Sequence, residues 1–288
     1  MSRGRIVVPL ALAAVLCAAA VAAAEGTVNG GGAPARRASP VRTRPMIPAD
    51  TPVPVPLPPP TFRRVRRPVP ILMYHAIGNP PPGAPFPALF TSAAAFRAQM
   101  RALAAAGYRP VTLDRVWRAW HGRDRLPRKP VVLSFDDGYR GDYAFAAPIL
   151  ARRGWPAVLN LVVANLHRTG WGLRPWMVKR MARHGWRVES HTLTHPNLTT
   201  LDPGMLRREV RRSRSIMRRL FHQRVDFFCY PGGAFDRAVV AAVRRAGYLG
   251  AETELPGLAG PRQRFTLRRV RVAGGESVGD YMASLRTG

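Results

Sequence analysis

Two neighbouring carboxylates stand at the end of an apolar run in this chain. The run Val131–Leu133 leads into Ser-Phe-Asp-Asp-Gly-Tyr, in which the carboxylates are Asp136 and Asp137. Successive side chains of an extended segment point to opposite sides, so we expect the two aspartates to do different jobs. One of them can bind a metal ion while the other handles protons.

Two histidines four residues apart follow a second apolar run. In the segment Ser-His-Thr-Leu-Thr-His they are His191 and His195, and a turn or short helix places both imidazoles on one side. With one aspartate they make a set of two histidines and one carboxylate, which leaves positions on a metal open for water and substrate. Such a metal lowers the pKa of water and polarises a carbonyl group. Together the two segments predict a mononuclear metal hydrolase, whereas the histidine pair alone also fits a surface turn.

Hydrolysis also needs a base and an acid. Asp136 is the candidate general base, and histidine suits the acid near neutral pH. We favour His75 as the acid, because it follows an apolar run as the other site residues do. The other histidines outside the pair are His121, His167, His184 and His222. Gly232 lies in Tyr-Pro-Gly-Gly after another apolar run, where its N–H can approach a substrate oxygen or simply form a turn.

Apolar runs and amphipathic stretches alternate from Pro68 to Val272, which predicts parallel strands with helices outside. We predict an irregular (β/α) barrel of about seven strands rather than an open sheet, because the chemical side chains follow the apolar strands. Ser92 or Thr91 is expected to cap a helix that ends at Gly107. The expected elements that follow include a strand at 111–113 and a long arginine-rich helix from Asp202 to about Phe221.

The first 24 residues have the pattern of an export signal. Two arginines precede an apolar stretch that ends in Ala22-Ala23-Ala24, which fits cleavage, although the stretch is also nearly long enough for an uncleaved anchor. Residues 25–67 are rich in proline, glycine and arginine and are expected to form a disordered spacer. The folded domain is then expected over 68–288, outside the cytoplasm. Cys229 would be the only cysteine after cleavage, and we expect it to be buried for packing.

The formal net charge of +29 comes almost entirely from arginine, since the chain has only two lysines, Lys129 and Lys179. Positive charge favours association with anionic envelope polymers. We do not expect nucleic acid as a partner, because the export signal points elsewhere and no aromatic-basic RNA signature or zinc-finger spacing is present. We expect a monomer.

These motifs resemble those of the polysaccharide deacetylases, the NodB-homology or carbohydrate esterase family 4 group. The resemblance covers roughly residues 68 to 250 and rests on the Asp-Asp, Ser-His-Thr-x-x-His and Tyr-Pro-Gly-Gly segments in that order. It implies that Asp136 is the base and that Asp137, His191 and His195 bind the metal, zinc or else cobalt, nickel or iron. It also implies that the N–H of Gly232 helps to hold the oxyanion.

The chain departs from the usual family pattern at two points. No histidine follows His222, so the usual C-terminal histidine motif is absent. Leu-Met-Tyr-His at 72–75 instead resembles a permuted branch that includes exported poly-N-acetylglucosamine de-N-acetylases, in which the early histidine is the acid. The arginine that pairs with the base is not at its usual place, and three later arginines are candidates to replace it: Arg268, Arg269 and Arg271.

The sequence therefore predicts a metal-dependent hydrolase that removes N-acetyl groups from a polysaccharide containing N-acetylglucosamine, outside the cell or in its wall. The alternatives are an O-acetyl esterase with the same fold and a catalytically degenerate wall-binding module. The complete Asp137, His191 and His195 set argues against the binding module, because binding alone needs no open metal site.

Overall fold

The computed structural model describes residues 62–63 and 67–287. Within these ranges, seven parallel strands close into a barrel, because β2 pairs with β12 on one side and with β7 on the other. The barrel strands, in their order around the barrel, are β2 (Ile71–Tyr74), β12 (Leu267–Arg271), β11 (Gly250–Pro256), β10 (Phe227–Cys229), β9 (Arg187–Ser190), β8 (Val158–Leu161) and β7 (Pro130–Asp137). The predicted irregular (β/α) barrel is confirmed.

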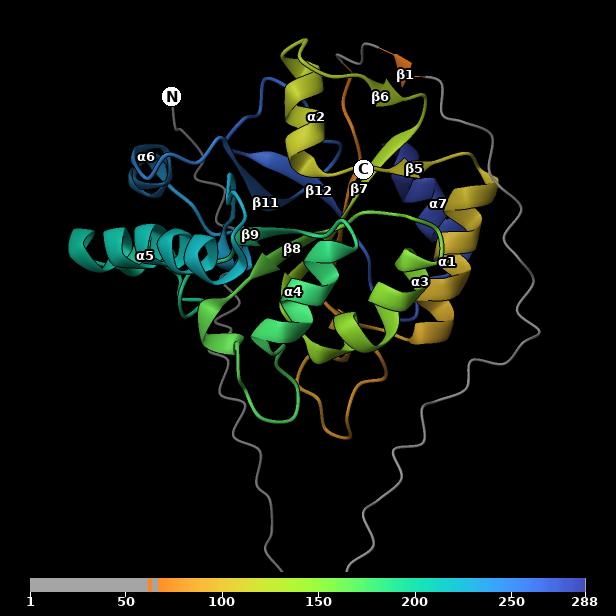
Figure 1. Cartoon of the computed structure of the whole chain (residues 1–288), viewed down its shortest axis with the longest axis horizontal. Helices are drawn as coiled ribbons and strands as arrows, with labels where there is room; N and C mark the ends of the chain where they lie inside the picture. The colour runs from red at the N-terminus through yellow and green to blue at the C-terminus, as the bar shows by residue number, and fades with distance from the viewer. Residues whose placement is uncertain (1–61, 64–66, 288) are drawn as a thin grey trace, which may run out of the picture. The chain divides into compact units, whose positions relative to one another are not determined.

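Helices surround this barrel (Figure 1). They are α1 (Ala93–Ala105), α2 (Leu113–Trp120), α3 (Ala147–Ala151), α4 (Pro175–Arg183), α5 (Pro203–Phe221), α6 (Arg237–Arg245) and α7 (Val278–Thr287). The helix α7 packs beside α1, and α5 packs beside α6 on the opposite flank. The strand and helix pattern of the sequence thus becomes the parallel arrangement that short βα units favour.

Shorter elements complete the described chain. The strand β5 (Arg109–Pro110) extends the sheet beside β7, β1 (Phe62–Arg63) pairs with β6 (Leu126–Pro127), and β3 (Ala76–Ile77) pairs with β4 (Phe90–Thr91). Single helical turns are η1 (Pro87–Leu89), η3 (Val163–Asn165), η4 (Leu198–Thr200) and η5 (Pro231–Gly233), and η2 (Asp142–Ala146) is a π-helical turn that leads into α3.

The helix boundaries follow local capping chemistry. Ser92 caps α1, since its Oγ accepts a hydrogen bond from the N–H of Ala95, as predicted. Asp202 caps α5 in the same way. The predicted strand at 111–113 is wrong, because β5 ends at Pro110 and α2 already begins at Leu113. Thr112 is the residue before the first helical turn, and Asp114 places a negative charge near its positive end.

The interior of the barrel has two layers of different chemistry. The layer beneath α2 is apolar, where Ile71, Val132, Val158 and Leu267 form one cluster with side chains of that helix. The layer at the carboxyl ends of the strands is polar and includes Asp136 and Arg269, both almost fully buried. Leu133 and Phe135, which alternate with the inward side chains, pack instead in the large cluster between barrel and helices. The barrel therefore buries a polar set at the end where its site lies.

The predicted export signal at 1–24 lies outside the described residues, as does most of the predicted spacer at 25–67. Among the helices that the structure does describe, none combines the length and the apolar character needed to cross a bilayer.

Candidate active site

The aspartate pair occupies the last two positions of β7. In the register with β8, Asp136 lies opposite Asn160 and Asp137 opposite Leu161. Asp136 is buried, whereas Asp137 is partly exposed and has a left-handed backbone with φ of 71°. Gly138 follows with φ of 90°, and a Cβ there would lie 2.5 Å from Leu161 Cδ1. The strand can therefore turn sharply only because glycine stands after the second aspartate.

Asp137 lies against the histidine pair. Its Oδ1 is 3.6 Å from Nε2 of His191 and 3.6 Å from Nε2 of His195. The two Nε2 atoms are 3.1 Å apart, so three metal-binding atoms converge on one point. Two imidazoles and one carboxylate at this spacing suit a divalent transition metal. The structure thus brings together the three side chains that the sequence predicts as ligands.

His191 is oriented for this task by a backbone carbonyl. Its Nδ1 lies 2.8 Å from the carbonyl oxygen of Cys229, so Nδ1 carries the proton and Nε2 keeps its lone pair. Burial, together with the neighbouring His195, lowers the pKa of His191 to about 4. The imidazole is therefore neutral near pH 7, as a metal ligand must be.

A buried carboxylate of α5 holds the loop between the two histidines. Glu209 accepts hydrogen bonds from the N–H groups of Leu193 and Thr194 at 2.8 and 3.0 Å, and from the Thr194 hydroxyl at 2.8 Å. His195 itself has a φ of 63°, and its N–H donates to Thr192 Oγ1 at 2.9 Å. The only trace of Glu209 in the sequence is that it is the single acidic residue of the arginine-rich helix α5.

Asp136 has different partners from its neighbour. Arg269 of β12 approaches both of its carboxylate oxygens at 2.8 Å, and Asn160 donates to Oδ1 at 2.9 Å. Burial alone would raise the pKa of Asp136, but the charge and hydrogen bond of Arg269, together with the neighbouring His191 and His75, outweigh burial and hold the pKa well below its ordinary range. Asp136 is therefore an ionised carboxylate at any physiological pH.

The choice among the three candidate arginines falls on Arg269, since it alone reaches the Asp136 carboxylate. Arg268 donates to the carbonyl oxygen of Pro256, and Arg271 pairs with Glu254 at the surface. The side chain of Arg269 is fully buried, and its Nε donates to the carbonyl oxygen of Thr253 at 2.8 Å.

Glu252 is a second buried carboxyl group beside this pair. Its Oε2 lies 3.8 Å from Nη1 of Arg269, and neither of its oxygens receives a hydrogen bond of normal geometry from any described residue. Burial raises the pKa of Glu252 to about 7 against the opposing charge of Arg269. Because Arg269 already pairs with one full negative charge, a second carboxylate in the same enclosed space is disfavoured.

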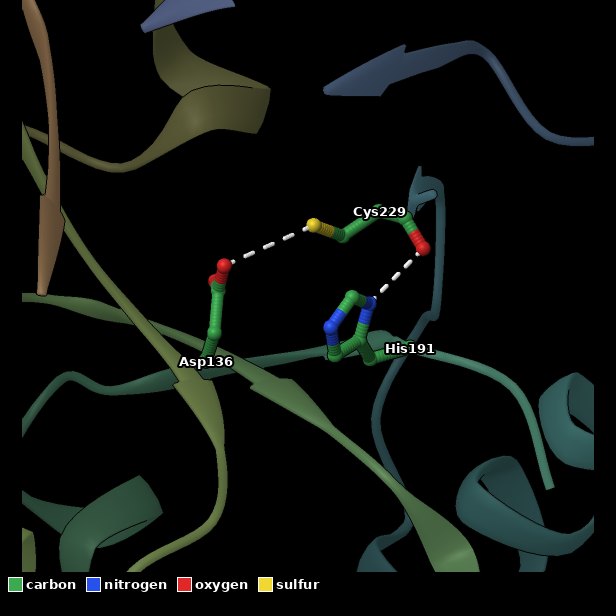
Figure 2. A group of neighbouring side chains, drawn as sticks. All are labelled: Asp136, His191 and Cys229. Carbon is green, nitrogen blue, oxygen red and sulfur yellow. Dashed lines mark hydrogen bonds between the residues drawn. The ribbon is translucent and has the colours of Figure 1, made fainter. Parts of the chain in front are cut away.

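A second group of possible metal ligands overlaps the first: Asp136, His191 and Cys229 (Figure 2). Its chemistry is less suitable. The Cys229 thiol lies 3.8 Å from Asp136 Oδ2, and burial raises the pKa of this thiol well above its ordinary value, so the thiol keeps its proton. Asp136 is already paired with Arg269. The set with Asp137 is therefore the better metal site, and Cys229 is buried as predicted.

The two remaining predicted residues follow two strands, β2 and β10, which β12 and β11 separate in the barrel. His75 directly follows β2 and is 8% exposed, and its positive charge would favour the ionised form of Asp136. Its Nδ1 is buried without a hydrogen-bond partner in the part of the chain that the structure describes. Gly232 lies in the turn η5 after β10, is exposed, and has a φ of 57°. The catalytic roles of His75 and Gly232 stay predictions.

Comparison with known proteins identifies the family of this chain. The sequence model of the family described as "Polysaccharide deacetylase" matches residues 123–251. YxkH of Bacillus subtilis (strain 168), whose name places it among the polysaccharide deacetylases, is 31% identical over 227 residues, which cover 76% of this chain and 77% of YxkH. The chain belongs to the polysaccharide deacetylase family.

Two further proteins are similar to this polysaccharide deacetylase. The crystal structure of BC0361, a polysaccharide deacetylase from Bacillus cereus, is similar with a TM-score of 0.68 and 28% identity, over 76% of this chain and 69% of that one. A segment of 64 residues is 45% identical to the poly-beta-1,6-N-acetyl-D-glucosamine N-deacetylase of Escherichia coli (strain K12). That segment covers 22% of this chain and 10% of the E. coli protein. The chain is thus a hydrolase of the deacetylase type.

Three site residues of this deacetylase were missed by sequence reasoning: Asn160, Glu209 and Glu252. Asn160 interrupts an apolar strand, and Glu252 begins a polar stretch inside another. A polar residue within an otherwise buried strand is a signal that could have pointed to the barrel interior.

Proposed function

We propose that this protein is a metal-dependent hydrolase that removes N-acetyl groups from a polysaccharide containing N-acetylglucosamine. The observation that carries the proposal is the convergence of Asp137, His191 and His195 beside an Asp136 that Arg269 holds ionised. The 64-residue similarity to a poly-N-acetyl-D-glucosamine N-deacetylase supports the choice of sugar.

Asp137, His191 and His195 would hold the metal, and their donor atoms fit a divalent ion, with zinc proposed ahead of cobalt, nickel or iron. When bound, such an ion polarises the acetyl carbonyl and makes water a stronger acid. The fixed proton on His191 Nδ1 directs the free Nε2 lone pair toward Asp137. These three side chains thus need no rearrangement to form a ligand set.

The other residues handle protons and charge in our proposal. Asp136 takes a proton from the attacking water while the water oxygen bonds to the acetyl carbon. The backbone N–H of Gly232 donates to the oxygen that becomes negative. His75 gives a proton to the nitrogen as the carbon–nitrogen bond breaks, so the products are acetate and a free amine. The unpartnered Nδ1 of His75 is consistent with a ring that exchanges protons.

We also propose that the folded domain acts outside the cytoplasm. Support comes only from the sequence, in which two arginines and an apolar stretch at 1–24 match an export signal and the proline-rich stretch 25–67 matches a spacer. The domain boundary at residue 68 rests on the same argument.

Acetate release tests this function directly. The metal-free protein, loaded in turn with zinc, cobalt, nickel or iron, is assayed with N-acetylglucosamine oligomers and with an O-acetylated glycan as the ester control. We expect release from the amide substrate, no turnover but normal metal binding in Asp136→Asn, and loss of both in Asp137→Ala. Activity in the Asp137→Ala variant, or release from the ester alone, would contradict the proposal.

A further inference from the structure

The outer side of helix α5 carries an open groove of about 1070 Å³ that is lined mainly by arginine. Six of its ten lining residues are Arg211, Arg212, Arg214, Arg218, Arg219 and Arg224. The other lining residues include His222 and Gln223, and neither an acidic residue nor a Phe, Tyr or Trp is among the described residues that line it. We call this feature the arginine groove.

Most of the positive charge in the arginine groove has no counterion among the residues that the structure describes. Arg224 and Arg214 share Asp226, at 2.9 and 3.7 Å. The other four arginines, which we call the unpaired arginines, are exposed and have neither an ion pair nor a side-chain hydrogen bond within 62–63 and 67–287: Arg211, Arg212, Arg218 and Arg219. Unneutralised charge is thus concentrated on one short length of helix.

The stability of α5 does not explain why so many unpaired arginines lie on this helix. The helix is anchored by its opposite face, where Leu206, Val210 and Met217 are buried. Arg218 and Arg219 stand in the last turn, where positive charge is favourable. Arg214 lies three residues after Arg211 and four before Arg218, and like charges at such spacings destabilise a helix. A bound anion would remove that repulsion.

We propose that the arginine groove binds a linear polymer with phosphodiester groups repeated along its backbone. The planar guanidinium group donates two parallel hydrogen bonds to a phosphate, and it stays charged at every physiological pH. Arg211 and Arg218 are seven residues apart, as are Arg212 and Arg219, which is two turns and about 10 Å along the helix axis. Each pair therefore lies on one side of α5 and can meet two separated charges of an extended chain. A groove suits a chain better than it suits a single small anion.

Other occupants fit less well. An N-acetylated glycan carries no charge for these arginines, and its deacetylated product carries ammonium groups that they repel. A membrane surface would need exposed apolar side chains to insert beside the charge, and Ala246 is the only apolar residue among the described residues that line the groove. Single-stranded nucleic acid is usually held by stacking on aromatic rings, which the described lining lacks.

The test uses the full chain and fluorescent synthetic poly(glycerol phosphate), with binding measured by anisotropy over a range of salt concentrations. The groove variant replaces the unpaired arginines, Arg211→Gln, Arg212→Gln, Arg218→Gln and Arg219→Gln. Glutamine has nearly the helix propensity of arginine. The matched control removes four exposed arginines of α1 and α4, Arg97→Gln, Arg101→Gln, Arg180→Gln and Arg183→Gln, which also form neither an ion pair nor a side-chain hydrogen bond with any described residue. Both variants lose the same net charge.

We expect the groove variant to bind at least about 10-fold more weakly, with the salt slope reduced by about 3, because each lost phosphate contact releases about one counterion fewer. The control should stay within about 2-fold of the wild type. Thermal melting and acetate release check that both variants fold.

Equal losses of polymer affinity in the two variants would overturn the proposal, because diffuse positive charge would then explain the binding. Absence of binding by the wild type near 0.15 M salt would also overturn it. Tighter groove-dependent binding to phosphatidylglycerol vesicles, to single-stranded DNA or to a polyuronate would replace the proposed partner.

Discussion

Arg269 fixes the protonation state of the base in this site but does not make it a strong base. The guanidinium group meets both oxygens of Asp136 at 2.8 Å and holds its pKa well below the ordinary range. A carboxylate with a low pKa is a weak base and accepts a proton less readily. Asp136 can therefore act only if the water it deprotonates is itself acidified, which ties the base to the metal site formed by the adjacent Asp137.

His75 is the residue whose role most needs a direct test. Replacing His75 with alanine should slow amide hydrolysis about 10²-fold or more, because the departing nitrogen loses its proton donor. The rate on p-nitrophenyl acetate should change far less, since that leaving group departs without protonation. Metal affinity should stay at the wild-type level, measured by competition with a chelator.

His184→Ala is the matched control for His75, because His184 is exposed at the end of α4. Its rates on both substrates should equal those of the wild type. Equal slowing of amide and ester hydrolysis in His75→Ala would instead indicate a general disturbance of the site and would return the acid role to another group.

At the scale of elements, the proposed metal site depends on a helix that contributes none of its proposed ligands. The loop from β9 to η4 carries His191 and His195, and its backbone is held by Glu209 of α5. The loop also continues the pairing with the chain after β8, where the N–H of Ala164 donates to the carbonyl oxygen of Leu193 at 2.8 Å. The position of α5 against the barrel therefore sets the geometry of the histidine pair.

Glu209→Ala should weaken zinc binding by about 10- to 100-fold, as loss of a supporting contact does at other metal sites. The cause is that the N–H groups of Leu193 and Thr194 lose their acceptor, so the loop no longer holds His195 in place. Isothermal titration with zinc measures the affinity. Glu209→Gln is the matched control, since its amide oxygen can still accept from the same N–H groups and should restore most of the affinity. Wild-type zinc affinity in the alanine variant would show that Glu209 only stabilises the helix.

The sequence was sufficient to predict the barrel and the three converging ligand residues, because strand ends and motif spacing are local features. It could not predict which arginine pairs with Asp136, since that contact spans 133 residues and depends on β12 closing against β2. Glu209 is hidden for the same reason, since its partners lie 15 and 16 residues earlier, in the loop. The strand at 111–113 was wrong because Val111 and Leu113 are both apolar and buried, and alternation alone does not distinguish a strand from a helix start.

At the scale of the whole molecule, the barrel combines an apolar layer with a buried charged one. Ile71, Val132 and Leu267 fill the end beneath α2, whereas Asp136, Arg269 and Glu252 fill the site end. Burying a charged pair contributes little net stability but makes the loss of either partner costly. The site end is therefore expected to be the pH-sensitive end of the fold.

Glu252 should make the stability of the barrel fall as the pH rises from about 4.5 to 7. Its pKa is about 7 in the folded protein and 4.5 as the ordinary value, so in this window the folded state holds a proton that the unfolded chain has lost. At about 1.4 kcal/mol per pKa unit, the free energy of unfolding should decrease by on the order of 3 kcal/mol, and the loss is complete above the folded pKa. Glu189 and Asp142 have raised pKa values as well, so the quantity to compare is the difference between variants.

Urea unfolding between pH 4.5 and 8 measures this difference. The free energy of unfolding should depend less on pH in Glu252→Gln, because glutamine mimics the protonated carboxyl group. The control Glu254→Gln, on the same strand but paired with Arg271 at the surface, should keep the wild-type slope, and an unchanged slope in Glu252→Gln would show that Glu252 is ionised in the fold.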